Sequence, residues 1–135
     1  MAYDNSFQAK VFPLLMMAFD TALGSLYNDR VYAGVAPSNP TFPCLVYQSQ
    51  DGGGVRDDHI NQNGWDGLIT FRSIDVTLSG AWNRLIQVAD ALPNVTISGY
   101  GVTYIPDHPQ WFPVEKLSTS NIYTAGLIVQ FKVNN

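Results

Sequence analysis

The sequence predicts one α+β domain, in which a mainly antiparallel four-stranded sheet carries two helices on one face, in the order α-β-β-α-β-β. Two segments have the three- and four-residue apolar spacing of helices, and a C-terminal segment has the two-residue alternation of a half-buried strand. The length of 135 residues suits a single domain with a real core. We therefore treat residues 1–135 as one folding unit.

The clearest strand runs from Ile122 to Val133. Side chains on a strand point to alternate faces, so this segment places an apolar row on one face and a mostly polar row on the other. The apolar row is Tyr123, Ala125, Leu127, Val129, Phe131 and Val133. Because this strand comes last, its partners must come from earlier in the chain, which predicts a non-local sheet.

The N-terminal segment predicts a helix, with an apolar stripe formed by Phe7, Val11, Leu14, Leu15, Ala18, Ala22 and Leu26. Pro13 removes one helical hydrogen bond and crowds the preceding turn, so the helix either begins near Pro13 or is kinked there. Gly24 and Asn28 predict its end, since these residues suit the conformations that follow helices.

The middle of the chain predicts two strands separated by a polar arm. Pro37, Pro40 and Pro43 mark an irregular linker, and residues 44–50 are the first strand. The arm covers about 51–66, and residues 68–79 are the second strand. The apolar phase changes within the second strand, which predicts either a bulge near Arg72 and Ser73 or a first half that buries its opposite face. The second arrangement suits a contact between subunits.

A second helix and a third strand follow. The helix has an apolar stripe formed by Trp82, Leu85, Ile86, Ala89 and Leu92; Ser79 or Gly80 caps its start, and Pro93 ends it. Residues 95–105 form the third strand, and the proline-containing residues 106–113 form a loop before the last strand.

The composition indicates a protein that hides part of its surface in contacts. Only 13% of residues are charged, where about 25% is typical. The net charge is −4, with 7 basic residues, which excludes strong binding to nucleic-acid phosphates. One cysteine excludes an intrachain disulfide, and there is no signal-peptide pattern. No apolar run approaches the roughly 20 residues that span a bilayer, so we expect a soluble protein that is made and kept in a cytosol, without membrane contact.

Two groups of residues have side chains suited to a chemical site, but neither pattern predicts one. Asp51, Asp57, Asp58, His59 and Asp66 are able to ligate a hard cation, but their spacing is not that of an EF-hand and a solvated loop explains them. The other candidate is a nucleophilic site in which His59 or His108 acts as a base for the Cys44 thiol. A free cysteine at a strand start is more often a small buried apolar residue, so we expect Cys44 to belong to the core. We expect no enzyme activity, no cofactor and no metal site.

The arm, the second apolar phase and the aromatic residues in predicted loops are the candidate interface. Aromatic residues are enriched at protein–protein interfaces, and a long polar arm in a compact domain suggests a binding role. The candidate interface residues are Asp51, Gly53, Asp57, Ile60, Trp65, Ile69, Phe71 and Trp111.

Short motifs extend this interpretation. Asp29, Arg30, Val31 and Tyr32 follow the first helix, Pro43-Cys44-Leu45-Val46-Tyr47 enters the first strand, and Tyr123 leads into the closing strand. With its "Arg-Val-Tyr" turn and "Pro-x-x-Val" strand, the chain resembles the tail-completion proteins, or tail terminators, of long-tailed bacteriophages, over nearly its whole length.

The resemblance implies a non-enzymatic virion protein at the tail or neck. It implies a homohexameric ring that caps the tail tube, ends tube polymerisation and provides the interface for head-to-tail joining. The implied partners are further copies of the chain, the major tail tube protein and a head-completion or connector protein, with genomic DNA passing through the lumen without specific binding. Two alternatives stay open: a head-completion or neck ring protein of the same particle, and a small α+β enzyme or ligand-binding domain.

Overall fold

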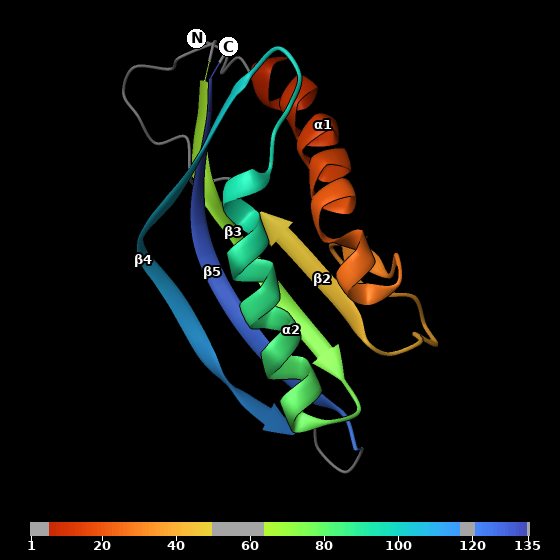
Figure 1. Cartoon of the computed structure of the whole chain (residues 1–135). Coiled ribbons are helices and arrows are strands. Elements are labelled where there is room, and N and C mark those ends of the chain that lie inside the picture. The colour runs from red at the N-terminus through yellow and green to blue at the C-terminus, as the bar shows by residue number, and fades with distance from the viewer. Residues whose placement is uncertain (1–5, 50–63, 117–120, 135) are drawn as a thin grey trace, which may run out of the picture.

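The computed structural model describes residues 6–49, 64–116 and 121–134, which form a five-stranded sheet with both helices on one face (Figure 1). The α+β class and the two-helix face are confirmed. The sheet order is β1-β2-β3-β5-β4. The helical elements are α1 (Ser6–Leu23), η1 (Gly24–Tyr27), α2 (Leu78–Ala91) and η2 (Leu92–Asn94), and the strands are β1 (Val31–Ala33), β2 (Cys44–Ser49), β3 (Gly64–Asp75), β4 (Gly101–Lys116) and β5 (Tyr123–Asn134).

The C-terminal strand is a long strand with a buried apolar face, as its alternating pattern predicted, and it lies inside the sheet. β5 pairs antiparallel with β3 on one side and with β4 on the other. Five members of the predicted apolar row are buried: Ala125, Leu127, Val129, Phe131 and Val133. Thr124 and Ile128 on the other face are buried as well, since a strand inside a sheet has neighbours on both sides.

The core lies between the sheet and the two helices. In α1, Leu15, Phe19 and Leu23 repeat every four residues and are buried, and Tyr27 of η1 continues the row. In α2, the buried residues are Ala81, Leu85 and Val88. The buried stripe of α1 is rotated from the predicted one, because Leu14 is 36% exposed whereas Phe19 is in the core.

The ends of the helices follow local chemistry. α1 continues through Pro13, so it does not begin there. Asn28 and Asp29 adopt left-handed conformations with φ of 52° and 64°, which ends the helical segment where the sequence predicted. Thr77, and not Ser79 or Gly80, caps α2, because its hydroxyl accepts a hydrogen bond from the Gly80 N–H at 3.0 Å.

The sheet has a fifth strand that the sequence pattern did not reveal. Val31–Ala33 pairs in parallel with residues 45–47 of β2, so the predicted turn at this position is a short edge strand. Three residues are too few for a periodic pattern, and a parallel pairing forms only once the intervening linker has folded back. The sheet is therefore mixed.

The predicted loop over 106–113 is also strand. β4 spans Gly101–Lys116, although it contains Pro106, Pro109 and Pro113. Proline is tolerated in an edge strand and at bulges, and β4 is an edge strand with register shifts between Ile105 and Gln110 and between Phe112 and Glu115. Residues 95–100 precede the strand, with an isolated bridge between Ile97 and Tyr100, so the predicted third strand began too early.

Candidate functional site

The predicted arm supplies few residues to the described surface. Asp51, Gly53, Asp57 and Ile60 lie outside the described residues. Trp65 lies in β3 opposite Val133 of β5, so the strand begins before the predicted end of the arm at about 66.

Ile69 and Phe71 face the helices and belong to the core of the subunit. Their side chains are 3% and 0% exposed, and β3 pairs with both neighbours without a register shift. The change of apolar phase thus reflects a strand whose first half buries Ile69 and Phe71, not a bulge. These side chains fill the space between the sheet and α1 within the single subunit, and their predicted part in an interface stays a prediction.

Trp111 is the predicted interface residue that the structure places at the surface. It lies in β4, is 39% exposed, and its ring packs on Trp82 of α2 with centroids 5.4 Å apart. Leu78 and Ile86 lie one helical turn before and after Trp82, so all three share a flank of α2. Leu78 and Ile86 are 56% and 39% exposed. We call Leu78, Trp82, Ile86 and Trp111 the α2–β4 patch.

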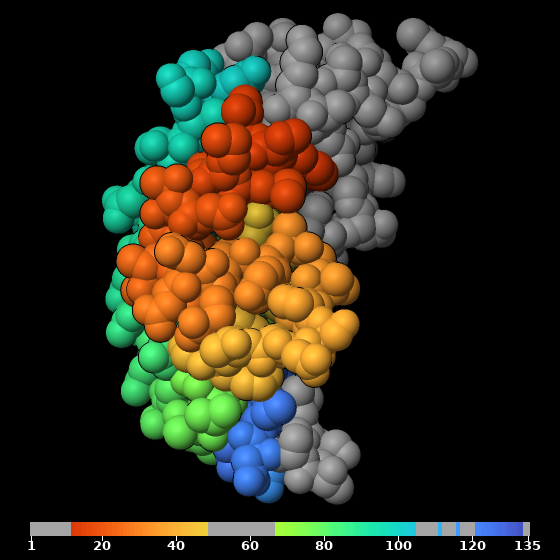
Figure 2. Space-filling view, turned by 90° about the vertical axis from the view of Figure 1, so that its right-hand side faces the viewer, coloured from red at the N-terminus to blue at the C-terminus, as the bar shows by residue number. Residues whose placement is uncertain are grey.

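A second apolar surface lies at the other edge of the sheet, between α1 and the strands β1 and β2. Figure 2 looks onto this edge, where α1 lies beside the segment that contains β1. The surface has a groove of about 310 Å³. We call it the α1–β1 groove; its lining residues are Phe12, Leu15, Met16, Phe19, Ala33, Gly34, Tyr47, Gln48 and Ile69. None of them is charged.

Asp20 follows Phe19, a lining residue of this groove, in α1. Burial raises the pKa of Tyr47 to about 12, and the negative charge of Asp20 adds to that rise. Partial burial also raises the pKa of Asp20 itself.

A third surface lies on the opposite flank of α1. A groove of about 390 Å³ separates Leu14 and Met17 from the segment that joins α2 to β4, including Val95 and Ile97. Met17 is 65% exposed. α1 thus presents apolar side chains on both flanks, whereas a surface helix usually shows polar residues there.

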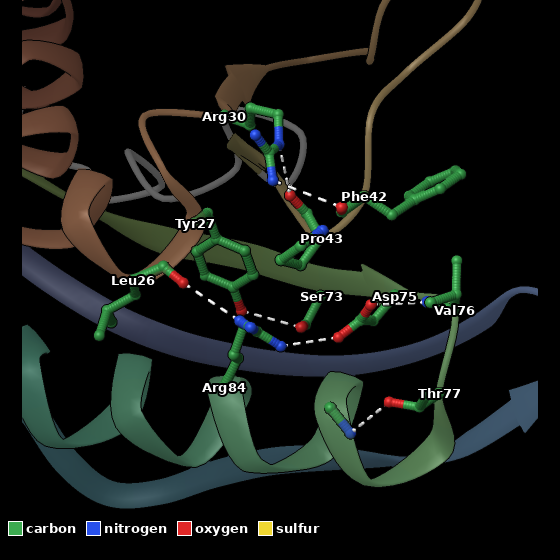
Figure 3. A network of polar contacts seen from close by, with 11 residues as sticks. Leu26, Tyr27, Arg30, Phe42, Pro43, Ser73, Asp75, Val76, Thr77 and Arg84 are labelled. Carbon is green, nitrogen blue, oxygen red and sulfur yellow. Dashed lines mark hydrogen bonds and ion pairs between the residues drawn. The ribbon is translucent and has the colours of Figure 1, made fainter.

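A polar network fastens the helices to the sheet (Figure 3). Arg84 of α2 donates from Nη1 to Asp75 Oδ2 at 2.7 Å and from Nε to the Leu26 carbonyl at 3.2 Å. The Tyr27 hydroxyl donates to Ser73 Oγ at 2.8 Å. Arg84 therefore joins α2, the end of β3 and η1, and it holds α2 in one position relative to α1.

A second arginine orders the linker. Arg30 donates to the backbone carbonyls of Pro43 and Phe42 at 3.0 and 3.3 Å (Figure 3). Leu45 N donates to the Arg30 carbonyl at 3.0 Å. These bonds hold the start of β2 beside β1. Arg30 belongs to the motif that resembles tail terminators, and its structural work here is to close the linker.

The buried polar groups do not form a nucleophilic site in the described part of the chain. Cys44 is fully buried, and this burial raises the pKa of its thiol, which favours the unreactive protonated form. Burial likewise raises the pKa of Tyr27. Of the histidines weighed as bases, His59 lies outside the described residues, and nothing is described of the side chain of His108.

Over residues 6–49, 64–116 and 121–134, no three His, Cys, Asp or Glu side chains gather as metal ligands. Of the candidate cation ligands in the sequence, Asp66 lies within these ranges, and Asp51, Asp57, Asp58 and His59 lie outside them. Neither α1 nor α2 has both the length and the apolar character needed to cross a bilayer, within the same described part of the chain.

The sequence of α2 contains the exposed apolar row of the α2–β4 patch, but apolar periodicity alone does not distinguish this row from the buried one. The predicted stripe merged Trp82 and Ile86 with the buried Leu85 and Leu92. Apolar residues at 78, 82 and 86 form their own row beside the buried row, which makes the apolar face of α2 wider than a core requires. The α1–β1 groove had no such signal, because it depends on β1.

Comparisons with known proteins support the fold. No protein-family model and no curated protein sequence matches this chain. Among solved structures, the chain is similar to one described as "Virion of native gene transfer agent (GTA) particle", with a TM-score of 0.60 and 14% sequence identity. The likeness covers 91% of this chain and 93% of the other. This α+β fold is therefore shared, over nearly its full length, with a chain of a gene transfer agent virion.

Proposed function

We propose that this chain is a structural virion protein that forms a ring on the end of a phage tail tube. The observation that carries the proposal is the end-to-end likeness of the fold to a chain of a gene transfer agent virion. The likeness spans 91% of this chain and 93% of the other, so the same subunit shape is available for the same kind of assembly. The resemblance to tail terminators rests on different observations, the motifs around Arg30 and Pro43, and leads to the same class of protein.

The surface supports an assembling role. Charged residues are few, and apolar side chains of α1, α2 and β4 are exposed in groups and not singly. Exposed apolar groups of this kind are typical of protein–protein contacts. A ring buries them between subunits and on neighbouring components, which are the tube protein on one side and a head-completion or connector protein on the other.

The ring is a homohexamer through which DNA passes without specific binding. A net charge of −4 suits a lumen that DNA must traverse, because an acidic wall does not retain phosphates. The ring ends tube polymerisation by covering the last tube subunits and offers its other face for head joining.

Light scattering and negative-stain electron microscopy of the purified chain, alone and with tube protein, test the proposal. We expect a hexamer or, if assembly needs a template, a ring on the ends of tubes. Tubes grown with the protein should also be shorter and of more uniform length than tubes grown without it. A chain that stays monomeric in both conditions contradicts the ring.

A head-completion or neck ring protein of the same particle shares this support, since the virion likeness does not distinguish the two positions. The two functions differ in their partner. Pull-down with purified tube protein and with purified connector protein separates them: a terminator binds tube ends, whereas a head-completion protein binds the connector and leaves tube length unchanged.

A further inference from the structure

The segment that carries β1 lies on the outside of the sheet. Every side chain of residues 30–43 is at least partly exposed, whereas Tyr27 before this segment and Cys44 after it are buried. Val31 packs in part against the core, and Val35 is 80% exposed. Figure 2 shows the segment at the surface beside α1. We call residues 30–43 the β1 strap; the burial of its side chains holds it only weakly.

A short ladder of backbone hydrogen bonds joins the β1 strap to β2. Leu45 N donates to the Arg30 carbonyl at 3.0 Å. At the other end of β1, Gly34 N donates to the Tyr47 carbonyl at 2.8 Å. In a parallel pair every second residue bonds to the partner strand, so Tyr32 is the bonded residue between Arg30 and Gly34. The attachment of the strap to the sheet therefore depends on these few bonds.

The Arg30 side chain closes the β1 strap on itself. Its guanidinium donates to the Pro43 carbonyl at 3.0 Å and to the Phe42 carbonyl at 3.3 Å (Figure 3). Both carbonyls lie at the far end of the strap, so one side chain ties its two ends together. The Arg30 N–H donates to the Tyr27 carbonyl at 3.0 Å, which keeps the backbone before the strap with η1. The strap is therefore a closed loop that joins or leaves β2 as one unit.

The β1 strap is not packed tightly against α1. The α1–β1 groove of about 310 Å³ lies between them, with Ala33 and Gly34 of the strap and Met16 of α1 among its lining residues. Gly34 has a φ of 86° where the chain leaves β1, a conformation that suits glycine. In the described sheet, β1 has one neighbouring strand, β2. β2 therefore supplies most of the contacts that hold β1.

The β1 strap covers a sheet edge that is otherwise open. β2 contains no proline, so each of its residues has the N–H that an added strand needs. An uncovered edge of this kind pairs with extended chains. At the opposite edge, β4 carries three prolines. The two edges are thus protected in different ways, β4 by its own sequence and β2 by a segment that is able to leave.

We propose that the β1 strap opens from β2 as one unit while both helices and the other four strands stay folded, and that the open form pairs its β2 edge with an extended polypeptide segment. The occupant is a segment that repeats the contacts of Val31–Ala33, because that is the strand seated on this edge in the closed subunit. This inference does not rest on the proposed ring.

Amide hydrogen exchange measured by nuclear magnetic resonance tests the opening in the unchanged chain. We expect the Gly34 and Leu45 N–H groups to exchange at similar opening free energies, about 100-fold faster than the N–H groups that join β3 to β5. Low concentrations of urea should hardly change this exchange, because opening the strap exposes little surface, whereas exchange of the central strands should accelerate. Strap amides that exchange only together with the central strands overturn the proposal.

Removal of the Arg30 guanidinium tests how the strap is closed. Arg30→Ala should accelerate exchange of the Gly34 and Leu45 N–H groups about tenfold or more, because hydrogen bonds from a charged group are lost. Exchange between β3 and β5 should stay unchanged. Arg72→Ala is the matched control, since Arg72 is exposed on the neighbouring strand and its removal changes the net charge equally. Equal strap exchange in the two variants overturns the role of Arg30.

A peptide with the sequence of residues 30–36 tests pairing of the open edge. We expect it to bind Arg30→Ala about tenfold more tightly than the unchanged chain, because more of that variant is open, and to shift the Leu45 and Tyr47 amide resonances. Methylation of the peptide at the Tyr32 nitrogen should abolish binding, since that N–H faces β2. Methylation at the Ala33 nitrogen, which faces away, is the control and should be tolerated.

The results separate the two halves of the proposal. Independent exchange of the strap without peptide binding overturns the pairing of the open edge, as does equal binding of the two methylated peptides. If circular dichroism shows that Arg30→Ala does not fold, the exchange pattern and the peptide titration of the unchanged chain decide both halves. Rings that form with a permanently closed strap leave the proposed function intact.

Discussion

At the scale of single residues, the turn between β3 and α2 is held by several polar contacts. The Asp75 carboxylate accepts a hydrogen bond from Val76 N at 2.6 Å and forms an ion pair with Arg84. Thr77 caps the N-terminus of α2. Both side chains lie over Gly80, where a β-carbon would meet Asp75 Oδ2 and would lie 2.6 Å from Thr77 Oγ1. Glycine at position 80 is therefore required by space, not by backbone conformation.

Gly80→Ala should lower the free energy of unfolding by about 2 kcal/mol, since the added methyl displaces the cap or the carboxylate. Urea unfolding followed by circular dichroism measures the change. Ser79→Ala is the control, because Ser79 is exposed and adjacent, and its effect should stay within about 0.5 kcal/mol. A loss for Gly80→Ala no larger than that of the control would show that the turn adapts without cost.

At the scale of elements, α1 is anchored by one aromatic residue. The Phe19 ring meets Tyr47, Phe71 and Phe131 edge-on, with centroid distances of 5.1, 5.2 and 5.5 Å. Edge-to-face pairs at these distances contribute beyond their buried area. Because the three partners come from β2, β3 and β5, Phe19 fixes α1 on the centre of the sheet.

Phe19→Ala should therefore lower the free energy of unfolding by about 3–5 kcal/mol, through lost burial and the cavity left among three rings. Met17→Ala serves as the comparison, because Met17 lies on the same helix and is 65% exposed, and it should change stability by less than about 0.5 kcal/mol. Equal effects of the two substitutions in denaturant unfolding would mean that α1 contributes little to the fold.

The edge strands show how element and assembly are linked. β4 carries three prolines, which lack the N–H that an added strand needs, and this discourages growth of the sheet by strand pairing. β4 therefore protects its side of the sheet against edge-to-edge pairing.

At the scale of the whole molecule, buried tyrosines link folding to alkaline pH. Burial raises the pKa of Tyr47 from 10.0 to about 12, with a smaller effect of Asp20, and burial also raises the pKa of Tyr27. Because the pKa of a buried tyrosine is higher in the folded protein, its contribution to the free energy of unfolding is fully present below pH 10.0, which is the tyrosine pKa in the unfolded chain. This stability is lost as pH rises toward 12, because the unfolded chain ionises first.

We expect the free energy of unfolding to fall between pH 10 and 12 by about 1 kcal/mol per pH unit for each buried tyrosine. Urea unfolding at several pH values, with tyrosinate absorbance recorded in parallel, measures this dependence. Tyr47→Phe should flatten the slope over the same range. An unchanged slope in that variant would show that Tyr47 titrates in the folded protein as it does in the unfolded chain.

The sequence alone determined the elements whose signals are local. The alternation in β5 predicted both its extent and its buried row, since a period of two depends only on which face meets a core. Asn28 marked the end of the first helical segment because its left-handed conformation is a local preference. The resemblance to tail terminators, on which the proposed function partly rests, also came from local motifs, around Arg30 and Pro43.

Tertiary structure alone decided the features that depend on neighbours. β1 exists because the folded linker brings Val31–Ala33 beside β2, and the prolines of β4 are accepted because that strand lies at an edge. Ile69 and Phe71 are buried in the core because α1 covers their face of the sheet. Trp82 and Trp111 meet only once α2 lies along β4. Strand pairing, the edge position of a strand and the burial of a sheet face under a helix all depend on segments that are distant in the sequence. No local sequence pattern therefore encodes them.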